Sequence, residues 1–238
     1  MNWDDPANWY NAMNPWGLSD DFYLKLVMDA ASVLDVGCGT GSLLHHARDA
    51  GHTGRLTGLD PDQAMLRQAQ VRDDIEWLLA DAASAPWTGE FDLAVMTGHA
   101  FQTLISDDVV RHSFRSIHAA LVDGGRFAFE TRHPQARAWE DWHGSSFEAS
   151  NPEGEAVTVS YDVLDVSGDV VRLTETLTGR WWESGRRTDF GELRFMAPEV
   201  LARFLDEAGF VIEEQFGDWQ RHPIGPTSPE IITIARKR

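Results

Sequence analysis

The stretch that most constrains the fold of this chain is ASVLDVGCGTGSLL, residues 31–44, in which a short apolar run leads into three glycines. The apolar residues hardly alternate with polar ones, which is typical of a strand buried on both faces of a parallel sheet. Asp35 stands near the end of the run, and Gly37, Gly39 and Gly41 follow at alternate positions. A glycine has no side chain to hold a ligand away from the backbone. The stretch therefore predicts a strand, a ligand-binding loop and a helix, in that order.

The first half of the chain repeats this pattern of an apolar strand followed by a helical segment, which is the signature of a parallel sheet with crossover helices. Pro61 is expected in the first turn of the second helix, where its missing N–H costs nothing. Ser106 is expected to cap the third helix, and a glycine to end it. We expect strands at 32–37, 54–60, 75–81, 91–98 and 125–132, and helices within 41–51, 61–72 and 106–125.

The pattern changes after about Pro134. Residues 155–196 alternate with period two, which predicts a hairpin that turns near Ser167, Gly168 and Asp169 and a third antiparallel strand. A helix over 197–210 and two closing strands follow. We expect an α/β fold with a Rossmann-like, seven-stranded, mostly parallel sheet and helices on both faces. Its predicted parts are an N-terminal helical lid at 1–29, a cofactor-binding domain at 30–134 and 197–238, and an antiparallel insertion at 135–196.

Composition narrows the function classes. The formal net charge of −18 over 238 residues opposes a nucleic-acid substrate, and no basic patch offsets it. No apolar run reaches the roughly 18 residues of a membrane span, and the first residues do not resemble a signal peptide. The single cysteine, Cys38, excludes an intramolecular disulfide and is expected to fill space rather than to act as a nucleophile. We expect a cytoplasmic protein with no nucleic-acid or membrane partner and no metal site.

The spacing of the glycines and acids discriminates between two nucleotide ligands. Asp60 ends the second strand 19 residues after Gly41, where a carboxylate can accept hydrogen bonds from ribose hydroxyls. Dinucleotide folds use G-x-G-x-x-G, whereas this loop reads G-x-G-x-G. Asp35 would also repel a pyrophosphate and attract an ammonium or sulfonium group. A cationic adenosine ligand is favoured, with a nicotinamide-dependent oxidoreductase as the rival reading.

The segment VLDVGCGTG resembles the signature loop of class I S-adenosylmethionine-dependent methyltransferases, of the small-molecule type. The resemblance continues in order through LTGLDPDQAMLRQA, WLLADAASAPW, FDLAVMTGHAFQTL, LVDGGRFAFET and MAPEVLARFLDEAGFVIEE. It implies S-adenosylmethionine as the methyl donor and S-adenosylhomocysteine as the product. An alternative is that the chain has a methyltransferase fold and binds the cofactor, but serves as a partner protein and catalyses no reaction.

The resemblance also implies roles for single residues. Asp60 would hold the ribose, Met65 would pack on the adenine, Asp81 and the Ala82 N–H would meet its edge, and the backbone near Thr97 would face the methionine end. Tyr10 and Trp16 of the N-terminal segment would line a lid over the sulfonium, unless they are ordinary core residues. The expected cofactor-binding residues are Tyr10, Trp16, Asp35, Gly37, Cys38, Gly39, Gly41, Asp60, Pro61, Met65, Asp81, Ala82 and Thr97.

The acceptor is less constrained by the sequence. His99, after the fourth strand, is the first candidate for a catalytic base, and His133, after the fifth, is the second; for either one, a packing role competes. Tryptophans of the insertion are expected to form an apolar pocket over the site, which favours a small-molecule acceptor and methylation of nitrogen, closely followed by oxygen. The same sheet could instead form a homodimer face. These tryptophans are Trp139, Trp142, Trp181 and Trp182.

Overall fold

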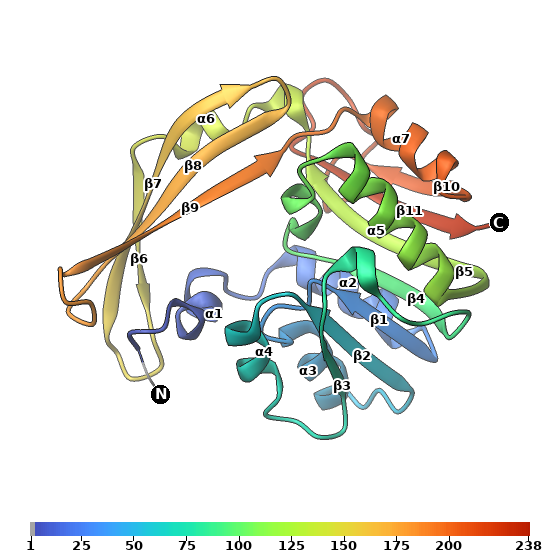
Figure 1. Ribbon diagram of the computed structural model, residues 1–238, viewed down its shortest axis with the longest axis horizontal. Coiled ribbons are helices and arrows are strands. Elements are labelled where there is room, and N and C mark those ends of the chain that lie inside the picture. Colours follow the sequence, from blue (N-terminus) through green and yellow to red (C-terminus); the bar gives the residue numbers. More distant parts are fainter. Residues whose placement is uncertain (1–2) are drawn as a thin grey trace.

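The computed structural model describes residues 3–238, which form two sheets (Figure 1). The first sheet has seven strands in the order β10-β11-β5-β4-β1-β2-β3. Their bounds are Ser32–Val36 (β1), Arg55–Asp60 (β2), Glu76–Leu79 (β3), Phe91–Met96 (β4), Leu121–Arg132 (β5), Phe210–Phe216 (β10) and Glu230–Lys237 (β11). Strands β1 to β5 pair in parallel, and β11 pairs antiparallel with both β5 and β10. The expected fold class is confirmed.

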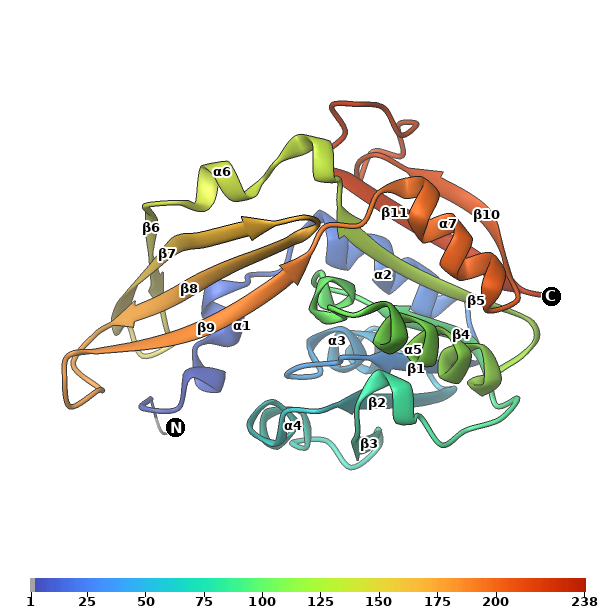
Figure 2. The same ribbon diagram turned by 45° about the horizontal axis from the view of Figure 1, so that its top comes forward.

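Helices cover both faces of this sheet (Figure 2). Helices α2 (Leu18–Met28) and α3 (Ser42–Asp49) pack on one face, which receives Val33 of β1. Helices α5 (Asp107–Ala120) and α7 (Pro198–Glu207) pack on the other face, which receives Leu34. Helix α4 (Gln63–Ala69) lies beside β2 and β3. Because both faces are covered, the central strands are buried along their length, as their uninterrupted apolar runs predicted.

The second sheet lies beyond the carboxyl ends of the parallel strands and arches over them (Figure 1). Its strands are β6 (Ser145–Ser150), β7 (Ala156–Ser167), β8 (Val170–Thr178) and β9 (Arg186–Arg194), all antiparallel and in sequence order. The predicted hairpin between β7 and β8 is confirmed, with Gly168 at a φ of +63° in its turn. Strand β6 was not expected, because SSFEAS lacks an apolar alternation.

Short helices fill the connections. The bounds of the α-helical ones are Tyr10–Met13 (α1) and Trp139–Trp142 (α6), and those of the 3-10 turns are Pro6–Asn8 (η1), Ala82–Ser84 (η2), Ala100–Thr103 (η3) and Pro134–Ala136 (η4). No helix among residues 3–238 is long and apolar enough to cross a membrane.

Three local expectations are wrong. Pro61 precedes the helix instead of opening it, because Asp62 is the N-cap of α4 and accepts the Ala64 N–H at 2.7 Å. Helix α5 starts on its predicted Ser106 cap but ends at Ala120 without a glycine, because the chain passes directly into extended backbone at β5. Strand β3 is the half-exposed edge of its sheet and not a buried strand.

An aromatic cluster holds the N-terminal segment beneath the second sheet. The fully buried Trp9 packs with Trp3, with Trp181 and with the apolar inner side of β7 and β8. Trp182 donates its indole N–H to the backbone oxygen of Asp4 at 3.0 Å. Residues 1–2 of the predicted lid lie outside the described residues. The cluster places α1 between the second sheet and the glycine loop.

Candidate active site

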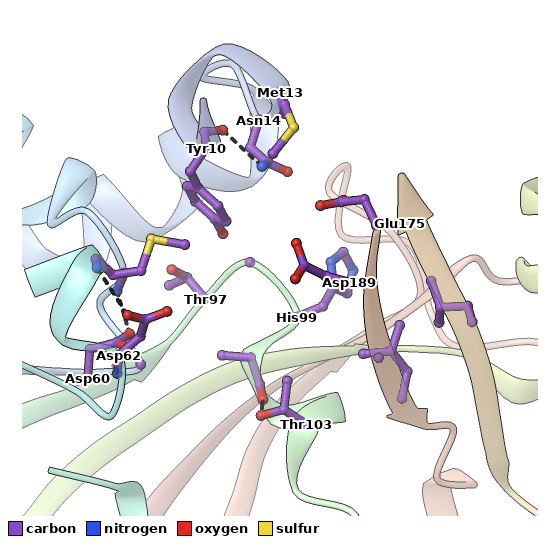
Figure 3. A pocket seen from close by; sticks show the side chains of 18 of the residues that line it. Tyr10, Met13, Asn14, Asp60, Asp62, Thr97, His99, Thr103, Glu175 and Asp189 are labelled. Carbon is purple, nitrogen blue, oxygen red and sulfur yellow. Dashed lines mark hydrogen bonds between the residues drawn. The ribbon is translucent and has the colours of Figure 1, made fainter. Parts of the chain in front are cut away.

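A cavity of about 660 Å³ lies between the carboxyl ends of the parallel strands and the inner side of the second sheet. Ligands of doubly wound sheets bind at this end of the strands, and the volume is in the range of small-molecule sites. One wall comes from the loops after β1, β2 and β4, another from α1, and the third from β7, β8 and β9 (Figure 3). The cavity thus joins the predicted cofactor loops to the insertion.

The glycine loop forms the floor of the cavity. Gly37, Gly39 and Gly41 all have positive φ, at +74°, +54° and +74°, which other residues rarely adopt. Gly37 and Gly39 line the cavity. Gly41 does not, because a Cβ at this position would lie 2.5 Å from the indole of Trp77. Two glycines therefore leave the backbone open to a ligand, and the third lets a helix pack closely against its neighbours.

Asp60 closes the loop from the end of β2. Its Oδ2 accepts the Gly39 N–H and its Oδ1 accepts the Asp62 N–H, each at 2.8 Å. Burial raises the pKa of Asp60, and these two hydrogen bonds oppose the rise. Each carboxylate oxygen keeps a second lone pair, and the side chain lines the cavity beside Met65. Asp60 can therefore receive two hydroxyl groups in a fixed orientation.

Asp35 lies beneath the same loop, in the middle of β1. It is 1% exposed, and its Oδ1 has no hydrogen-bond partner among the described residues. Burial, followed by the charges of Asp60 and Glu130, raises the pKa of Asp35 to about 8. An unpaired buried carboxylate is costly unless a cation compensates it. The site therefore fits a ligand that carries an ammonium or sulfonium group near the first strand.

Tyr10 of α1 covers the cavity from the N-terminal side (Figure 3). Its ring lies 3.9 Å from the position of a Cβ on Gly39, and its hydroxyl lies 3.6 Å from that of Gly98. Asn11 ties α1 to the glycine loop, because the Thr40 hydroxyl donates to its side-chain oxygen at 2.7 Å. Burial and the charge of Asp60 raise the pKa of Tyr10, so its hydroxyl stays protonated.

His99 follows β4 and is held at two points. Its backbone is left-handed, with a φ of +59°, and its N–H donates to Oε1 of Glu130 at 2.7 Å. Its Nε2 lies 3.0 Å from both carboxylate oxygens of Glu230. The imidazole also lines the cavity. The predicted base candidate is thus brought to the site by two acids that sequence reasoning had not connected to it.

The second sheet contributes a mixed wall instead of the expected apolar pocket, in which three polar side chains stand beside Leu173, Phe190 and Leu193. Tyr161, Glu175 and Asp189 are direct neighbours across β7, β8 and β9, and all three line the cavity. Figure 3 shows the two acids. The Tyr161 hydroxyl donates to Glu175 at 2.7 Å, and Arg187 pairs with Asp189 at 2.9 Å. Two acids directly opposite each other destabilise a sheet. The row of Tyr161, Glu175 and Asp189 therefore has a role other than stabilising the sheet.

Only one of the four tryptophans of the insertion faces this space. Trp142 lines the cavity with the guanidinium of Arg132 4.9 Å from the centre of its ring. Arg132 also donates to Gln102 at 2.8 Å, and burial lowers the pKa of Arg132. Trp139 packs on Phe195. The expectation that four tryptophans form an apolar pocket is therefore wrong, because Trp181 and Trp182 pack in the N-terminal cluster instead.

The structure brings eight of the predicted site residues to the cavity and leaves seven outside it. The eight are Tyr10, Gly37, Gly39, Asp60, Pro61, Met65, Thr97 and His99, and the seven are Trp16, Asp35, Cys38, Gly41, Asp81, Ala82 and His133.

Besides Asp35 and Gly41, the five other residues outside the cavity have local contacts. Trp16 stacks on His46, with ring centres 3.9 Å apart. Asp81 caps η2 by accepting the Ala83 N–H at 2.9 Å. His133 is buried and accepts the Gln135 N–H at 3.1 Å, and burial lowers the pKa of His133. Cys38 packs in a small apolar cluster and Ala82 in the main core.

Sequence reasoning missed Glu175, Asp189 and Glu230. A signal for the first exists, since Glu175 falls on the same side of β8 as the apolar Leu173 and Leu177, where a carboxylate is out of place. Glu230 carried no signal, because its partner His99 is 131 residues away.

The chain is similar to known methyltransferases. Residues 33–125 match the model of a methyltransferase domain family. A protein from Geobacillus sp. (strain WCH70) that carries the general name methyltransferase is 23% identical over 250 residues, covering all of both chains. A malonyl-[acyl-carrier protein] O-methyltransferase from Pseudescherichia vulneris is 38% identical over 103 residues, which are 42% of this chain and 39% of that protein. This second match spans about two-fifths of the relative.

The fold agrees with that of solved methyltransferases. An amino pentose methyltransferase from Micromonospora echinaspora, solved with bound S-adenosylmethionine, superimposes with a TM-score of 0.73 at 20% identity and covers 96% of this chain and 94% of its own. Its likeness shows the fold, and the family match covers the strands and loops that form the cavity floor. Residues 33–125 therefore match a methyltransferase domain, and the whole chain has the fold of solved S-adenosylmethionine-dependent methyltransferases.

Proposed function

We propose that this enzyme transfers the methyl group of S-adenosylmethionine to the nitrogen of a small amine. The observation that carries the proposal is the pair of carboxylates, Glu175 and Asp189, on the cavity wall opposite the cofactor loops. Carboxylates attract an ammonium group and repel a phenolate or carboxylate. The cavity volume of about 660 Å³ suits a metabolite, and the net charge of −18 opposes a nucleic-acid chain.

The cofactor is assigned to the floor of the cavity. Asp60 is placed to hold the ribose hydroxyls, Met65 to pack on the adenine, and Asp35 to compensate the positive charge at the methionine end through the loop above it. Tyr10 covers this part of the cavity and, with the backbone of Thr97 and the loop glycines, excludes water. Asp81 and Ala82 stay predictions for the adenine edge. The cofactor supplies an activated electrophilic methyl group, so the chain has only to bind, orient and deprotonate the acceptor.

His99 is proposed as the catalytic residue that takes the acceptor proton. Its imidazole lines the cavity between the loop after β4 and the acid wall. His133, the second candidate, is assigned no catalytic role because its Nδ1 is engaged by its own turn. The insertion over 135–196 acts as the cap over the acceptor, and the homodimer face stays a prediction.

Oxygen is the second candidate for the attacking atom. The relative from Pseudescherichia vulneris is named an O-methyltransferase, and Arg132 in the cavity offers a cation that would pair with a carboxylate acceptor. Arg132 already donates to Gln102 and lies against Trp142. Glu175 and Asp189 also have partners, but these two carboxylates outnumber the single guanidinium that lines the cavity. Amines are therefore favoured over carboxylic acids.

The test is a panel of small amines, amino sugars, phenols and carboxylic acids, with S-adenosylhomocysteine release as the readout. We expect turnover of amines, and Glu175→Gln should raise the KM for an amine about tenfold, as expected for a lost charge-assisted contact of about 1.4 kcal/mol. The matched control is Glu192→Gln, since Glu192 pairs with Arg172 on the other side of the same sheet. Turnover of carboxylic acids alone, abolished by Arg132→Met, would replace the amine proposal with the oxygen one.

A further inference from the structure

We infer that Glu230 is a positioning residue that holds His99 with its hydrogen on Nε2 and thereby presents the Nδ1 lone pair to the acceptor nitrogen. This inference rests on the proposed function, in which His99 takes the acceptor proton. Glu230 lies at the start of β11, in the last tenth of the chain, and outside every segment of the cofactor site.

The contact between the two side chains is bifurcated and enclosed. Both carboxylate oxygens of Glu230 lie 3.0 Å from Nε2 of His99, and Glu230 is 9% exposed. An ionised carboxylate only accepts hydrogen bonds, so Nε2 must carry the hydrogen and a neutral ring then leaves Nδ1 as an acceptor. Nδ1 of His99 has no partner within residues 3–238. A ring that lines the cavity and keeps one free acceptor nitrogen can receive a proton from a bound ligand.

A second acid fixes the backbone of the same histidine. Glu130 of β5 is fully buried, and its Oε1 accepts the His99 N–H at 2.7 Å. Its Oε2 accepts the hydroxyl of Tyr23 on α2. A left-handed backbone costs a residue other than glycine about 1–2 kcal/mol, and the Glu130 contact offsets this at His99. The histidine is therefore locked at both its backbone and its ring.

Sheet topology brings these two acids together. Strands β5 and β11 are antiparallel neighbours, in which Ile232 pairs with Glu130 and Glu230 pairs with Arg132. The two acids therefore stand two residues apart along the strands, at the carboxyl end of β5 where β4 delivers His99. A histidine that only filled space would not need an acid on each side.

Titratable groups face His99 from β11, β5 and α2. Glu230 faces it from β11 and Glu130 from β5, while Arg132 of β5 lies close enough to Glu230 to offset part of its charge. Tyr23 of α2 remains neutral, because burial and Glu130 raise its pKa well above the ordinary value. Two acids and one guanidinium therefore surround the ring, and burial raises the pKa of Glu130.

The proton balance of the step is complete. The acceptor nitrogen forms its bond to the methyl carbon while the carbon–sulfur bond breaks and its electron pair stays on sulfur. The nitrogen then carries one proton more than its neutral methylated product. Nδ1 of His99 takes this proton, Nε2 keeps its own hydrogen on Glu230, and the cavity passes the proton to water as the product leaves. A substrate that arrives as an ammonium loses its proton to the same atom before attack, and its methylated product then leaves as an ammonium ion while the proton on Nδ1 passes to water.

The decisive experiment is long-range ¹H–¹⁵N correlation of histidine side chains in the cofactor-free protein, which reports which ring nitrogen carries the hydrogen. The His99 signals are identified by their loss in His99→Gln. We expect the Nε2–H form for wild type, the same form for Glu230→Gln, whose amide oxygen still accepts, and a mixture of both forms for Glu230→Ala. An Nδ1–H form in wild type, or an unchanged form in Glu230→Ala, would overturn the inference.

Kinetics supply the functional arm once an amine substrate is in hand. Glu230→Ala should lower kcat about tenfold or more while the affinity for S-adenosylhomocysteine stays within about twofold, with partial recovery in Glu230→Gln. The control is Glu214→Ala, because Glu214 on β10 pairs with the exposed Arg221. An unchanged kcat in a folded Glu230→Ala variant would contradict the positioning role of Glu230 but not the proposed function. If wild type turns over no amine, the proposed function fails, and the tautomer measurement still decides how Glu230 holds His99.

Discussion

Oδ2 of Asp60 accepts the backbone N–H of Gly39 at 2.8 Å, which joins the end of β2 to the middle of the glycine loop. The same carboxylate accepts the Asp62 N–H through Oδ1. Each oxygen is oriented by one backbone donor and keeps a lone pair on the cavity side. The acid therefore shapes the loop in addition to its proposed contact with the ligand.

Replacing Asp60 should affect binding and stability together. Asp60→Asn keeps one acceptor and leaves one backbone N–H facing an amide N–H, so we expect a loss of about 1–3 kcal/mol in unfolding free energy. Binding of S-adenosylhomocysteine should weaken about tenfold or more. Calorimetric titration and thermal unfolding measure the two effects. Asp123→Asn is the control, since its side chain is 98% exposed and far from the cavity; unchanged affinity in Asp60→Asn would refute the ribose assignment.

The raised pKa of Asp35 makes cofactor binding depend on pH. With a pKa of about 8, Asp35 is protonated in the free enzyme at neutral pH, and a nearby cation lowers that value. Binding then releases a proton, so the affinity for S-adenosylmethionine should rise with pH, by up to about tenfold per unit, and level off above about pH 8. Titrations in buffers of different ionisation enthalpy measure the released proton. Asp35→Asn should bind more weakly and without this dependence, and a wild-type affinity that falls with pH contradicts the assignment.

Asp35 also makes the stability of the free enzyme depend on pH. The pKa of Asp35 is raised from 3.8 to about 8, so between these values the folded state keeps a proton that the unfolded state has lost. The contribution of Asp35 to the free energy of unfolding therefore decreases as pH rises through this window. Asp35→Asn removes the contribution, so its melting temperature should gain on that of wild type as pH rises. With saturating cofactor this relative gain should disappear, whereas a variant whose melting temperature falls relative to that of wild type as pH rises would contradict the assignment.

Tyr10 and Trp16 should respond differently to truncation, although both were expected in the lid. Tyr10 lies over Gly39 and lines the cavity, whereas Trp16 stacks on His46 outside it. We expect Tyr10→Ala to weaken S-adenosylhomocysteine binding about tenfold, because a buried aromatic ring contributes about 1–2 kcal/mol or more to a contact. Trp16→Ala should leave the affinity within about twofold. Equal losses in both variants would restore the two-aromatic lid.

The parallel sheet could be predicted because the sequence patterns that specify it each span only a few neighbouring residues. Each central strand is a short apolar run that only a doubly covered sheet can bury, and the glycines after β1 mark where the chain must turn with positive φ. Asp60 follows from the same logic, since it ends a buried strand at a fixed distance from the loop. The helix start at Ser106 was equally local. Pro61 was misplaced by two residues because a cap depends on which side chain reaches the free N–H groups, and Asp62 does so.

By itself the sequence thus determined the sheet, the glycine loop and the acid that closes it, because strand periodicity, turn chemistry and motif spacing act over a few residues. The tertiary structure alone decided the acceptor side of the cavity. The row of Tyr161, Glu175 and Asp189 exists only through the register of three strands, and Glu230 meets His99 only because β11 folds back beside β5. Such contacts join residues far apart in the chain, and their geometry is set by packing of the whole domain.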